Sequence, residues 1–567
     1  MGRLAQYLPI LQWLPEYRRS QLKGDLSGGI TVGIMLIPQG MAYAMIAGLP
    51  PVYGLYASIV PQVIYAIFGT SRPLSVAPVA MDSLLVATGV SLLATEGTDT
   101  YVAFAILLAF FMGLFQLLLG VLKMGFITNL LSKPVISGFT SAAAIIIGLN
   151  QLKYLLGTDI IKSSSVLQVI SDTITKLDQT HLLTLMVGLG GILVIKSIKL
   201  VHQGIPGALV AVVLGISTVY LLDLHDSGVS IVQNIPEGLP AFTLPSFDMG
   251  KTAELVPLAL TISIVAFMEA YSVAKALEDQ RKDHKVDASQ ELIALGAANL
   301  AGSLFQSYPV TGGFSRSAVN HQAGANTPLA SVISAGLIAL NLLFLTPLFY
   351  YLPQAILASV IMVAVSSLID VAYAVRLWKN HKAEFTLLFL TFVVTLQFGM
   401  VPGIVTGVVI SILLLLYKAA YPHIAVLGRL SGGREFRNVK RFEHLDTWQD
   451  KLILRVDAPI TFINIQYIKD FIEEGLRKAP ACNTVLLDAS AVSYLDASAI
   501  ESLGKLILSL RKKGIRFEVA SLVGPVRDIL FKTGLIDLIG EENIFLNLQN
   551  AVEHMGQTNK SIALQHG

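Results

Sequence analysis

Charged residues are scarce in this sequence. Asp, Glu, Lys and Arg make up 14% of its 567 residues, whereas soluble domains carry about a quarter. Hydrophobic residues make up 54% and the mean hydropathy is +0.66, so the sequence argues against a water-soluble globule of this size. The formal net charge is only +2, which argues against a nucleic-acid binder, because such a protein needs a concentrated basic face.

Cysteine is nearly absent as well. The single Cys482 excludes a disulfide framework and a cysteine-rich metal site, and we interpret it as a small buried apolar residue. The ten histidines lack the i, i+4 pairing on a helix that would suggest zinc. Neither a Ser/His/Asp nor a Cys/His set is visible, and the C-terminal part lacks a Gly-rich phosphate loop. The sequence therefore predicts no enzyme activity, no metal and no cofactor.

Apolar stretches follow one another from residue 27 to residue 421. Many are close to the ~20 residues that a helix needs to cross a bilayer. Clear examples are Tyr101–Leu122, Leu182–Ile198, Pro206–Leu222, Leu255–Leu277 and Phe385–Phe398. Stretches this long and this closely repeated cannot all be buried in a soluble core. We therefore predict an α-helical polytopic membrane domain over 27–421.

Basic residues are distributed unevenly among the loops between these spans. One alternating set of loops contains basic groups around Arg18, Lys285 and Arg376, whereas the opposite set, including the acidic stretch 223–250, is nearly free of them. Lys153 is an exception in one long external loop, and long loops follow the rule poorly. Because cytoplasmic loops carry the excess of Lys and Arg, both termini are predicted to lie in the cytosol, which requires an even number of spans.

The composition changes near residue 422. Residues 422–438 are polar and rich in Gly and Arg, and they are interpreted as a linker. Strand patterns (KLILRVD, TVLLDAS, IRFEVASL) then alternate with helix patterns (NIQYIKDFIEEGLRKA, SAIESLGKLILSLRKK, VRDILFKTGLIDLIG). This alternation predicts a small soluble α/β domain over 439–555, followed by a polar tail at 556–567. Residues 1–26 are predicted to be a cytosolic segment without a cleaved signal peptide.

Two membrane segments are interrupted. The segment 69–89 contains Pro73 and Pro78, and the segment 307–324 contains Pro309 followed by two glycines. Proline removes a backbone donor and glycine weakens a helix, so both segments are predicted to be extended chain that runs into a half-helix. Paired interruptions in corresponding halves point to a transporter's midplane site, and the free N–H groups of facing half-helices suit an anion. The alternative is ordinary kinks, which membrane helices tolerate.

Two charged residues stand at membrane depth near these segments. Arg316 lies at the start of the second half-helix, and Glu269 lies in the middle of a span. Such residues are costly in a bilayer and usually face a cavity. We interpret Arg316 as the fixed positive charge of an anion site. Glu269 is interpreted as a titrating group, because burial disfavours its charged form unless a cation offsets it; the alternative is a structural pairing with a neighbouring helix.

The residues around these segments carry a family resemblance. GDLSGGITVGIMLIPQGMAYAMIAGLPPVYGLY (24–56) and YAIFGTSRPLSVAPVA (65–80) closely resemble signature sequences of the sulfate permease (SulP) family of anion transporters, which also includes bicarbonate carriers. The C-terminal domain, with D-x-S at 488–490 and DASA at 496–499, resembles the STAS domain of these carriers. The resemblance implies a fold of seven plus seven inverted-repeat segments, divided into core and gate domains, and usually a homodimer.

In that family the anion lies between the third and tenth segments, and the first and eighth segments form walls. The resemblance implies substrate-binding roles for Gln39, Ala42 and Tyr43 on the first segment, for Ala77, Pro78 and Val79 on the third, and for Thr311, Gly312, Gly313, Phe314, Ser315 and Arg316 on the tenth. It places the proton-coupling Glu269 on the eighth. Asp82 stands where an apolar residue is expected. It either pairs with a proton or cation or satisfies a helix start, and the second interpretation is preferred.

Ser498 has two interpretations. It resembles the serine that related bacterial anti-sigma antagonists phosphorylate. Residues 498–501 also form an S-x-x-E pattern, which predicts a capping box at the start of the following helix, and we prefer the cap. A regulatory role for the domain, with an unknown cytosolic partner, is implied by the resemblance alone.

Together these observations predict a secondary active transporter that takes up sulfate with protons across the plasma membrane, or across the inner membrane if the source is a bacterium. Arg316 favours an oxyanion of higher charge. The alternative within transport is a sodium-coupled bicarbonate symporter or an anion exchanger of the same family. An alternative of another class is a non-transporting sensor that signals through its STAS domain, and the intact charged centre argues against it.

Overall fold

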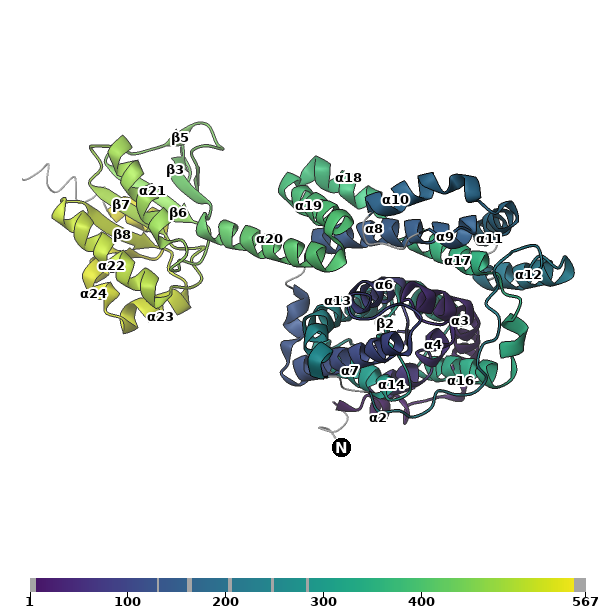
Figure 1. Cartoon of the computed structure of the whole chain (residues 1–567). Helices are drawn as coiled ribbons and strands as arrows, with labels where there is room; N and C mark the ends of the chain where they lie inside the picture. Colours follow the sequence, from purple (N-terminus) through teal and green to yellow (C-terminus); the bar gives the residue numbers. More distant parts are fainter. Residues whose placement is uncertain are drawn as a thin grey trace, which may run out of the picture. The chain divides into compact units, whose positions relative to one another are not determined.

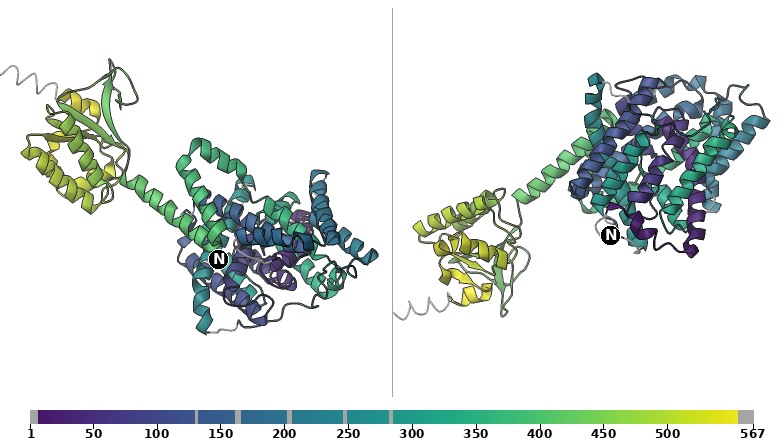
Figure 2. Two further views of the ribbon diagram at one scale, coloured as in Figure 1. Left: turned by 45° about the horizontal axis from the view of Figure 1, so that its top comes forward. Right: turned by 90° about the horizontal axis from the view of Figure 1, so that it is seen from below.

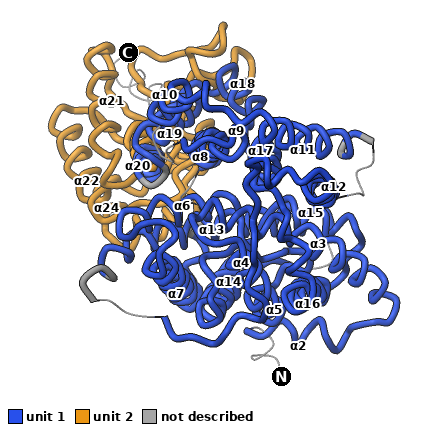
Figure 3. The backbone as a smooth tube through the Cα atoms, turned by 45° about the vertical axis from the view of Figure 1, so that its right-hand side comes forward, with its two compact units in different colours: residues 1–411 blue, residues 412–567 orange. Residues whose placement is uncertain are grey.

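The computed structural model describes residues 7–129, 132–160, 166–201, 206–245, 249–281 and 285–554. The chain divides into two compact units, Met1–Ser411 and Ile412–Gly567, which Figure 3 shows in two colours. Each unit has hydrophobic core residues of its own. The predicted polar tail, 556–567, lies outside the described residues.

Helices build the first unit. The first half of its chain contains α2 (Ile10–Trp13), α3 (Arg19–Ile46), α4 (Val52–Tyr56), α5 (Val60–Phe68), α6 (Ala80–Val90), α7 (Asp99–Val121), α8 (Lys133–Asn150), α9 (Leu152–Leu156), α10 (Val166–Thr175), α11 (Leu182–Val201) and α12 (Gly207–Leu221). The second half contains α13 (Met249–Arg281), α14 (Ala288–Ser303), α15 (Phe314–Gln322), α16 (Leu329–Phe344), α17 (Gln354–Ser366), α18 (Val371–Asn380), α19 (Lys382–Phe398) and the start of α20 (Met400–Ala420).

Six helical stretches among the described residues are long and apolar enough to cross a membrane: Arg19–Ile46, Asp99–Val121, Lys133–Leu156, Ala253–Arg281, Gln354–Asn380 and Pro402–Ala420. Shorter apolar helices, including α6, α11, α12 and α16, accompany them. All five stretches named from the sequence form helices, α7, α11, α12, α13 and α19. Large apolar side chains such as Leu118, Leu193 and Leu214 are exposed on them, as expected of helices that face lipid.

The helices of the first unit form two groups (Figure 1). One group, with α3, α4, α6, α7, α13, α14 and α16, surrounds a short pair of strands, whereas α8–α12 and α17–α19 lie together in the other. Small residues allow close packing inside the first group. A Cβ atom on Gly113 of α7 would lie 2.8 Å from the carbonyl oxygen of Gly296 in α14, so these two backbones touch. The division matches the core and gate domains that the resemblance implied.

The second unit is an α/β sandwich around one sheet. Its strands are β3 (Ile424–Leu430), β4 (Phe436–Asn438), β5 (Leu445–Asp446), β6 (Lys451–Val456), β7 (Thr484–Asp488), β8 (Arg516–Ala520) and β9 (Ile544–Phe545), in the order β4-β3-β6-β7-β8-β9 with β5 beside β3. Strands β6 to β9 are parallel, and β3 is antiparallel to β6. The helices α21 (Ile465–Lys478), α22 (Ala497–Lys512), α23 (Gly524–Lys532) and α24 (Leu535–Ile539) pack against the sheet (Figure 2).

Two expectations for this unit are corrected. Residues 422–438, interpreted as a linker, contain strands β3 and β4, which pair with Arg429 opposite Phe436. Ala425 and Leu427 are both buried and show the alternation of a strand. The glycines and arginines that follow made the segment look like a polar linker. The last predicted helix is two helices, α23 and α24. Gly534 separates them at φ +70°, a left-handed conformation that interrupts a helix and that glycine adopts readily.

Candidate functional site

Two short strands meet inside the first group of helices. Strand β1 (Val76–Ala77) pairs antiparallel with β2 (Thr311–Gly312), with Val76 opposite Gly312 and Ala77 opposite Thr311. Strand β1 leads into α6, and β2 leads into α15. Both interrupted segments are therefore extended chain followed by a half-helix, as predicted, and they are not ordinary kinks. The pairing also brings together the two halves of the membrane chain.

Glycines allow the second strand to fit against its neighbours. A Cβ atom on Gly312 would lie 2.8 Å from the Leu74 side chain. A Cβ atom on Gly313 would lie 2.9 Å from Nη2 of Arg316 and 3.1 Å from Cγ1 of Val79. A residue with a Cβ atom at either position must therefore displace one of these neighbouring side chains. At Gly313 that neighbour is the one cationic side chain at the start of α15.

Both half-helices begin with backbone amides that lack an intrahelical acceptor. Ser83 N donates to Val79 O in α6, and Ser317 N donates to Gly313 O in α15. The three amides before each of these donors have no acceptor one turn earlier in their helix. Neither N-cap residue, Val79 or Gly313, offers a side-chain acceptor. The positive ends of two helices consequently start from the same strand pair, an arrangement that attracts an anion.

Arg316 joins the two half-helix starts. Its side chain is buried, with 2% exposed. Nη1 donates to the carbonyl oxygen of Pro78 at 2.8 Å, and Nη2 donates to that of Ala77 at 3.1 Å. Its Nε has no partner among the described residues. Because neutral carbonyls hold the guanidinium, they orient its positive charge without cancelling it.

Glu269 lies on α13, which passes beside β2. Thr311 Oγ1 donates to the carbonyl oxygen of Ala266 at 2.7 Å, one turn before Glu269. Glu269 interacts electrostatically with Arg316 and with Tyr43, yet no hydrogen bond joins it to the guanidinium, and its Oε2 has no partner among the described residues. The alternative for Glu269 was a structural pairing with a neighbouring helix. Its Oε2 atom makes no such pairing among the described residues.

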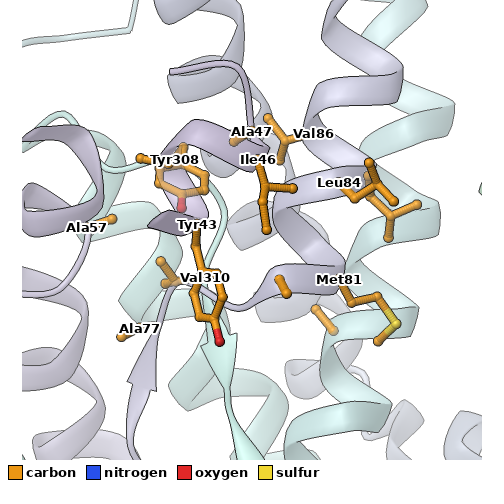
Figure 4. Packing of buried hydrophobic residues seen from close by; sticks show 14 of the residues in the cluster. Tyr43, Ile46, Ala47, Ala57, Ala77, Met81, Leu84, Val86, Tyr308 and Val310 are labelled. Atoms are coloured by element: carbon orange, nitrogen blue, oxygen red, sulfur yellow. The ribbon is translucent and has the colours of Figure 1, made fainter. Parts of the chain in front are cut away.

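The first segment contributes a wall on α3. Gln39, Ala42 and Tyr43 are all buried, and Gln39 Oε1 has no partner in the part of the chain that the structure describes. Tyr43 interacts electrostatically with Arg316. Figure 4 shows its ring in one cluster with Ala77, Met81, Tyr308 and Val310. The structure thus brings α3 to the strand pair, as the resemblance implied.

The remaining predicted residues also lie at the two half-helix starts. Val79 is the buried N-cap of α6. Phe314 and Ser315, at the start of α15, are exposed, Phe314 by 61%. Their roles in binding an anion stay predictions.

Asp82 lies in the first turn of α6 and is fully buried. Neither of its carboxylate oxygens has a partner among the described residues. The preferred interpretation, that Asp82 satisfies the helix start, is therefore wrong. A residue in this third helical position must reach back to the N-cap amide, as Glu or Gln does in a capping box, and Asp is one methylene shorter.

Sequence reasoning missed several polar residues that hold the site. Ser317 Oγ accepts a hydrogen bond from Ser75 N at 3.0 Å, and Asn320 Nδ2 donates to Pro73 O at 3.0 Å. The Tyr308 hydroxyl lies 3.2 Å from Ser83 Oγ. The signal for the first two was available, because Ser317 and Asn320 are polar at helical spacing inside an apolar domain.

The capping prediction at Ser498 is wrong. Helix α22 begins at Ala497, and its N-cap is Asp496, whose Oδ1 accepts from Ala499 N at 2.7 Å. The helix starts earlier than expected because Asp is as good an N-cap residue as Ser. Glu501 pairs with Lys505 instead of reaching back. Ser498 is left exposed in the first turn of the helix.

Comparisons with known proteins identify relatives of both units of the chain. Residues 22–391 match the model of the sulfate permease family, and residues 442–551 match that of the STAS domain. The chain is 40% identical over 566 residues to sulfate transporter 4.1, chloroplastic, of Arabidopsis thaliana, covering 96% of this chain and 82% of that one. It is 34% identical to high affinity sulfate transporter 2 of Stylosanthes hamata, covering 97% and 87%.

Two solved structures share the fold. The murine solute carrier 26 family member A9 anion transporter, in the inward-facing state, superposes with a TM-score of 0.89 at 23% identity, covering 98% of this chain and 94% of that one. The transmembrane domain of a cyanobacterium bicarbonate transporter, BicA, gives a TM-score of 0.61 at 22% identity, covering 70% and 98%.

Proposed function

The chain belongs to the sulfate permease family of membrane anion transporters, and on that premise we propose that it takes up sulfate together with protons. The family transports anions, so the protein is a multi-pass carrier and not an enzyme. The observation that carries the finer proposal is Arg316. Its buried guanidinium lies where both half-helices begin, within electrostatic range of the half-buried acid Glu269.

The anion side of the proposal rests on three sources of positive charge. The N-termini of α6 and α15 each contribute about half an elementary charge, and Arg316 contributes a full one. A site of this charge favours a dianion such as sulfate over a monoanion. The relatives named above as sulfate transporters support the same choice.

The proton side rests on Glu269. When ionised, it offsets the charge of Arg316 and competes with the incoming anion. When protonated, it leaves the guanidinium available. Proton and sulfate then strengthen each other's binding, and this coupling is reciprocal. Movement of the helix group that contains β1 and β2 against the other group would carry both across the membrane.

Sodium-coupled bicarbonate uptake or anion exchange is the alternative within the family, and the fold shared with BicA supports it. A smaller positive charge would suffice for bicarbonate, so Arg316 argues for sulfate. A sensor that does not transport would have no need of a proton-accessible acid beside the arginine.

The test is uptake of labelled sulfate into proteoliposomes under an imposed proton or sodium gradient. We expect uptake driven by an inward proton gradient and indifferent to sodium. Glu269→Gln, a mimic of the protonated acid, should bind and exchange sulfate but lose its response to the proton gradient. Glu254→Gln, at an exposed acid of the same helix, is the matched control and should behave as the parent protein. Sodium-driven bicarbonate uptake without sulfate uptake would refute the proposal.

We extend the proposal to the assembly and its location. The distribution of basic residues supports cytosolic termini, and the resemblance supports a homodimer in the plasma membrane, or in the inner membrane of a bacterium. The STAS domain would dock a cytosolic partner, and its exposed Ser498 is the residue proposed for phosphorylation. Labelling of single cysteines introduced at Ser498 and at Asp226 from either side of the membrane tests the orientation.

A further inference from the structure

Asp82 is the one buried acid of the described first unit with two unpartnered carboxylate oxygens. It is 0% exposed and lies in the first turn of α6, three residues after Val79. An ionised carboxylate with no donor and no cation is very costly at membrane depth. The group must therefore hold a proton whenever no counter-charge is available to it.

The charged and titratable groups around Asp82 come from several elements. Glu269 of α13 and Tyr308, which precedes β2, both interact with it electrostatically. Arg316 and Tyr43 act on the same Glu269 and Tyr308. The hydroxyl of the neighbouring Ser83 is hydrogen-bonded to the Tyr308 hydroxyl, with 3.2 Å between the two oxygens. Asp82 thus shares one electrostatic cluster with the acid assigned to proton coupling, so loss of a proton from one carboxyl raises the proton affinity of the other.

We propose that Asp82 is a second proton-carrying carboxyl of the transport site, so that one sulfate crosses the membrane with two protons. The inference rests on the proposed function. It concerns a residue that departs from the family pattern, and it adds a stoichiometry to the coupling assigned to Glu269. Both protons bind from the side where sulfate enters and leave on the side where sulfate is released.

Charge conservation in the moving group of helices supports this stoichiometry. In the empty site, the N-terminus of α6 is the counter-charge for Asp82, and Arg316 is the counter-charge for Glu269. Arg316 and the two ionised carboxylates then carry a net charge of about minus one. In the loaded site, Arg316, two protonated carboxyls and one sulfate dianion carry the same net charge. The loaded and empty forms therefore cross the membrane field with equal charge in opposite directions, so the complete transport cycle moves no net charge and its equilibrium does not depend on the membrane potential.

A metal cation fits the same place poorly. Hard cations take about six oxygen ligands, and the described residues contain no group of three or more His, Cys, Asp or Glu side chains suited to a metal. A proton needs only one oxygen. The two unpartnered oxygens of Asp82 thus point to a proton.

The stoichiometry has a measurable consequence at equilibrium. With two protons, each unit of pH difference should balance a sulfate concentration ratio of about 100-fold, since each proton contributes about tenfold. With one proton, the ratio should be about tenfold, and a net negative charge would move. A potential of 100 mV, negative inside, would then change the ratio by about 50-fold.

The experiment measures the sulfate ratio at which net flux reverses in proteoliposomes of the full chain, at set pH differences and at potentials clamped with potassium and valinomycin. The parent protein should reverse at about 100-fold per pH unit, independent of voltage. Asp82→Asn should reverse at about tenfold per pH unit and depend on voltage. Thr88→Val, on the same helix, where Thr88 Oγ1 bonds only to Leu85 O, should match the parent.

The outcomes separate this inference from the proposed function. Absence of proton-driven sulfate uptake in the parent protein would defeat the proposed function itself. Proton-driven uptake that reverses at about tenfold per pH unit would leave that function standing and refute the second proton. If Asp82→Asn does not insert, the reversal ratio of the parent alone decides the number of protons. A parent that follows a sodium gradient would also overturn the assignment.

Discussion

The substitution Gly313→Ala tests whether the position of Arg316, and not merely its charge, makes the anion site. The added Cβ atom would lie 2.9 Å from Nη2 of Arg316 and 3.1 Å from its Cζ. Such contacts are too close, so the guanidinium must move. The backbone at Gly313 has φ −91° and ψ 134°, which any L-residue adopts. The substitution therefore perturbs the side-chain contact without straining the backbone.

The expected magnitude follows from the hydrogen bonds at stake. Arg316 is held by Pro78 O at 2.8 Å and by Ala77 O at 3.1 Å. The Nη2 atom that the new methyl displaces makes the second bond. A hydrogen bond to a charged group contributes about 1.5–3 kcal/mol, which corresponds to a loss of about 10- to 150-fold in affinity if the guanidinium leaves its binding position.

The assay is the Kd and the initial uptake rate for labelled sulfate, with membrane insertion checked in parallel. Gly336→Ala on α16 is the control, because nothing lies within 4 Å of its Cβ position. In a double-mutant cycle, Gly313→Ala should add nothing to Arg316→Ala, since both remove the same interaction. Normal affinity of an inserted Gly313→Ala protein, or full additivity in the cycle, would refute the assignment of Arg316.

Other perturbations test separate parts of the molecule. Arg316→Lys should insert normally but bind sulfate at least about tenfold more weakly, because a point charge cannot span two carbonyls and an anion; normal binding would show that charge alone suffices. A chain that ends at Tyr421 keeps the whole site and should bind sulfate within about twofold of the full protein; loss of binding by an inserted truncation would make the STAS domain part of the site. Burial raises the pKa of Glu518 in β8 to about 7, so the folded domain holds this proton more tightly than the unfolded chain. The free energy of unfolding should therefore fall as pH rises from 4.5 through about 7, by about 3 kcal/mol from this group. Glu518→Gln should remove that loss when denaturant unfolding of residues 421–567 is measured at pH 5 and 8, and an equal change in unfolding free energy for both proteins would contradict the assignment. Burial also raises the pKa of the Cys482 thiol, so Cys482 should react with a maleimide only after denaturation; fast labelling of the native protein would show it to be accessible.

Much of this protein was determined by local sequence. Hydropathy alone marked the spans that became α7, α11, α12, α13 and α19, because a helix in lipid must satisfy its own backbone and bury no charge. Proline and glycine marked the interrupted segments for the same reason, since neither supports a continuous helix. The alternating patterns of the C-terminal domain predicted most of its strands and helices. Arg316 and Glu269 stood out because charge at membrane depth is rare.

Tertiary structure decided what these residues contact. No local pattern shows that Val76 faces Gly312, or that the guanidinium of Arg316 donates to Pro78 and Ala77, because these partners are far apart in the chain. The same holds where expectations failed: β3 is a strand because β6 pairs with it. Asp82 looked like a helix-start residue, and only the packed structure shows its two oxygens without partners. The energy and protonation of a buried polar group depend on the groups packed around it, and those groups come from distant parts of the chain.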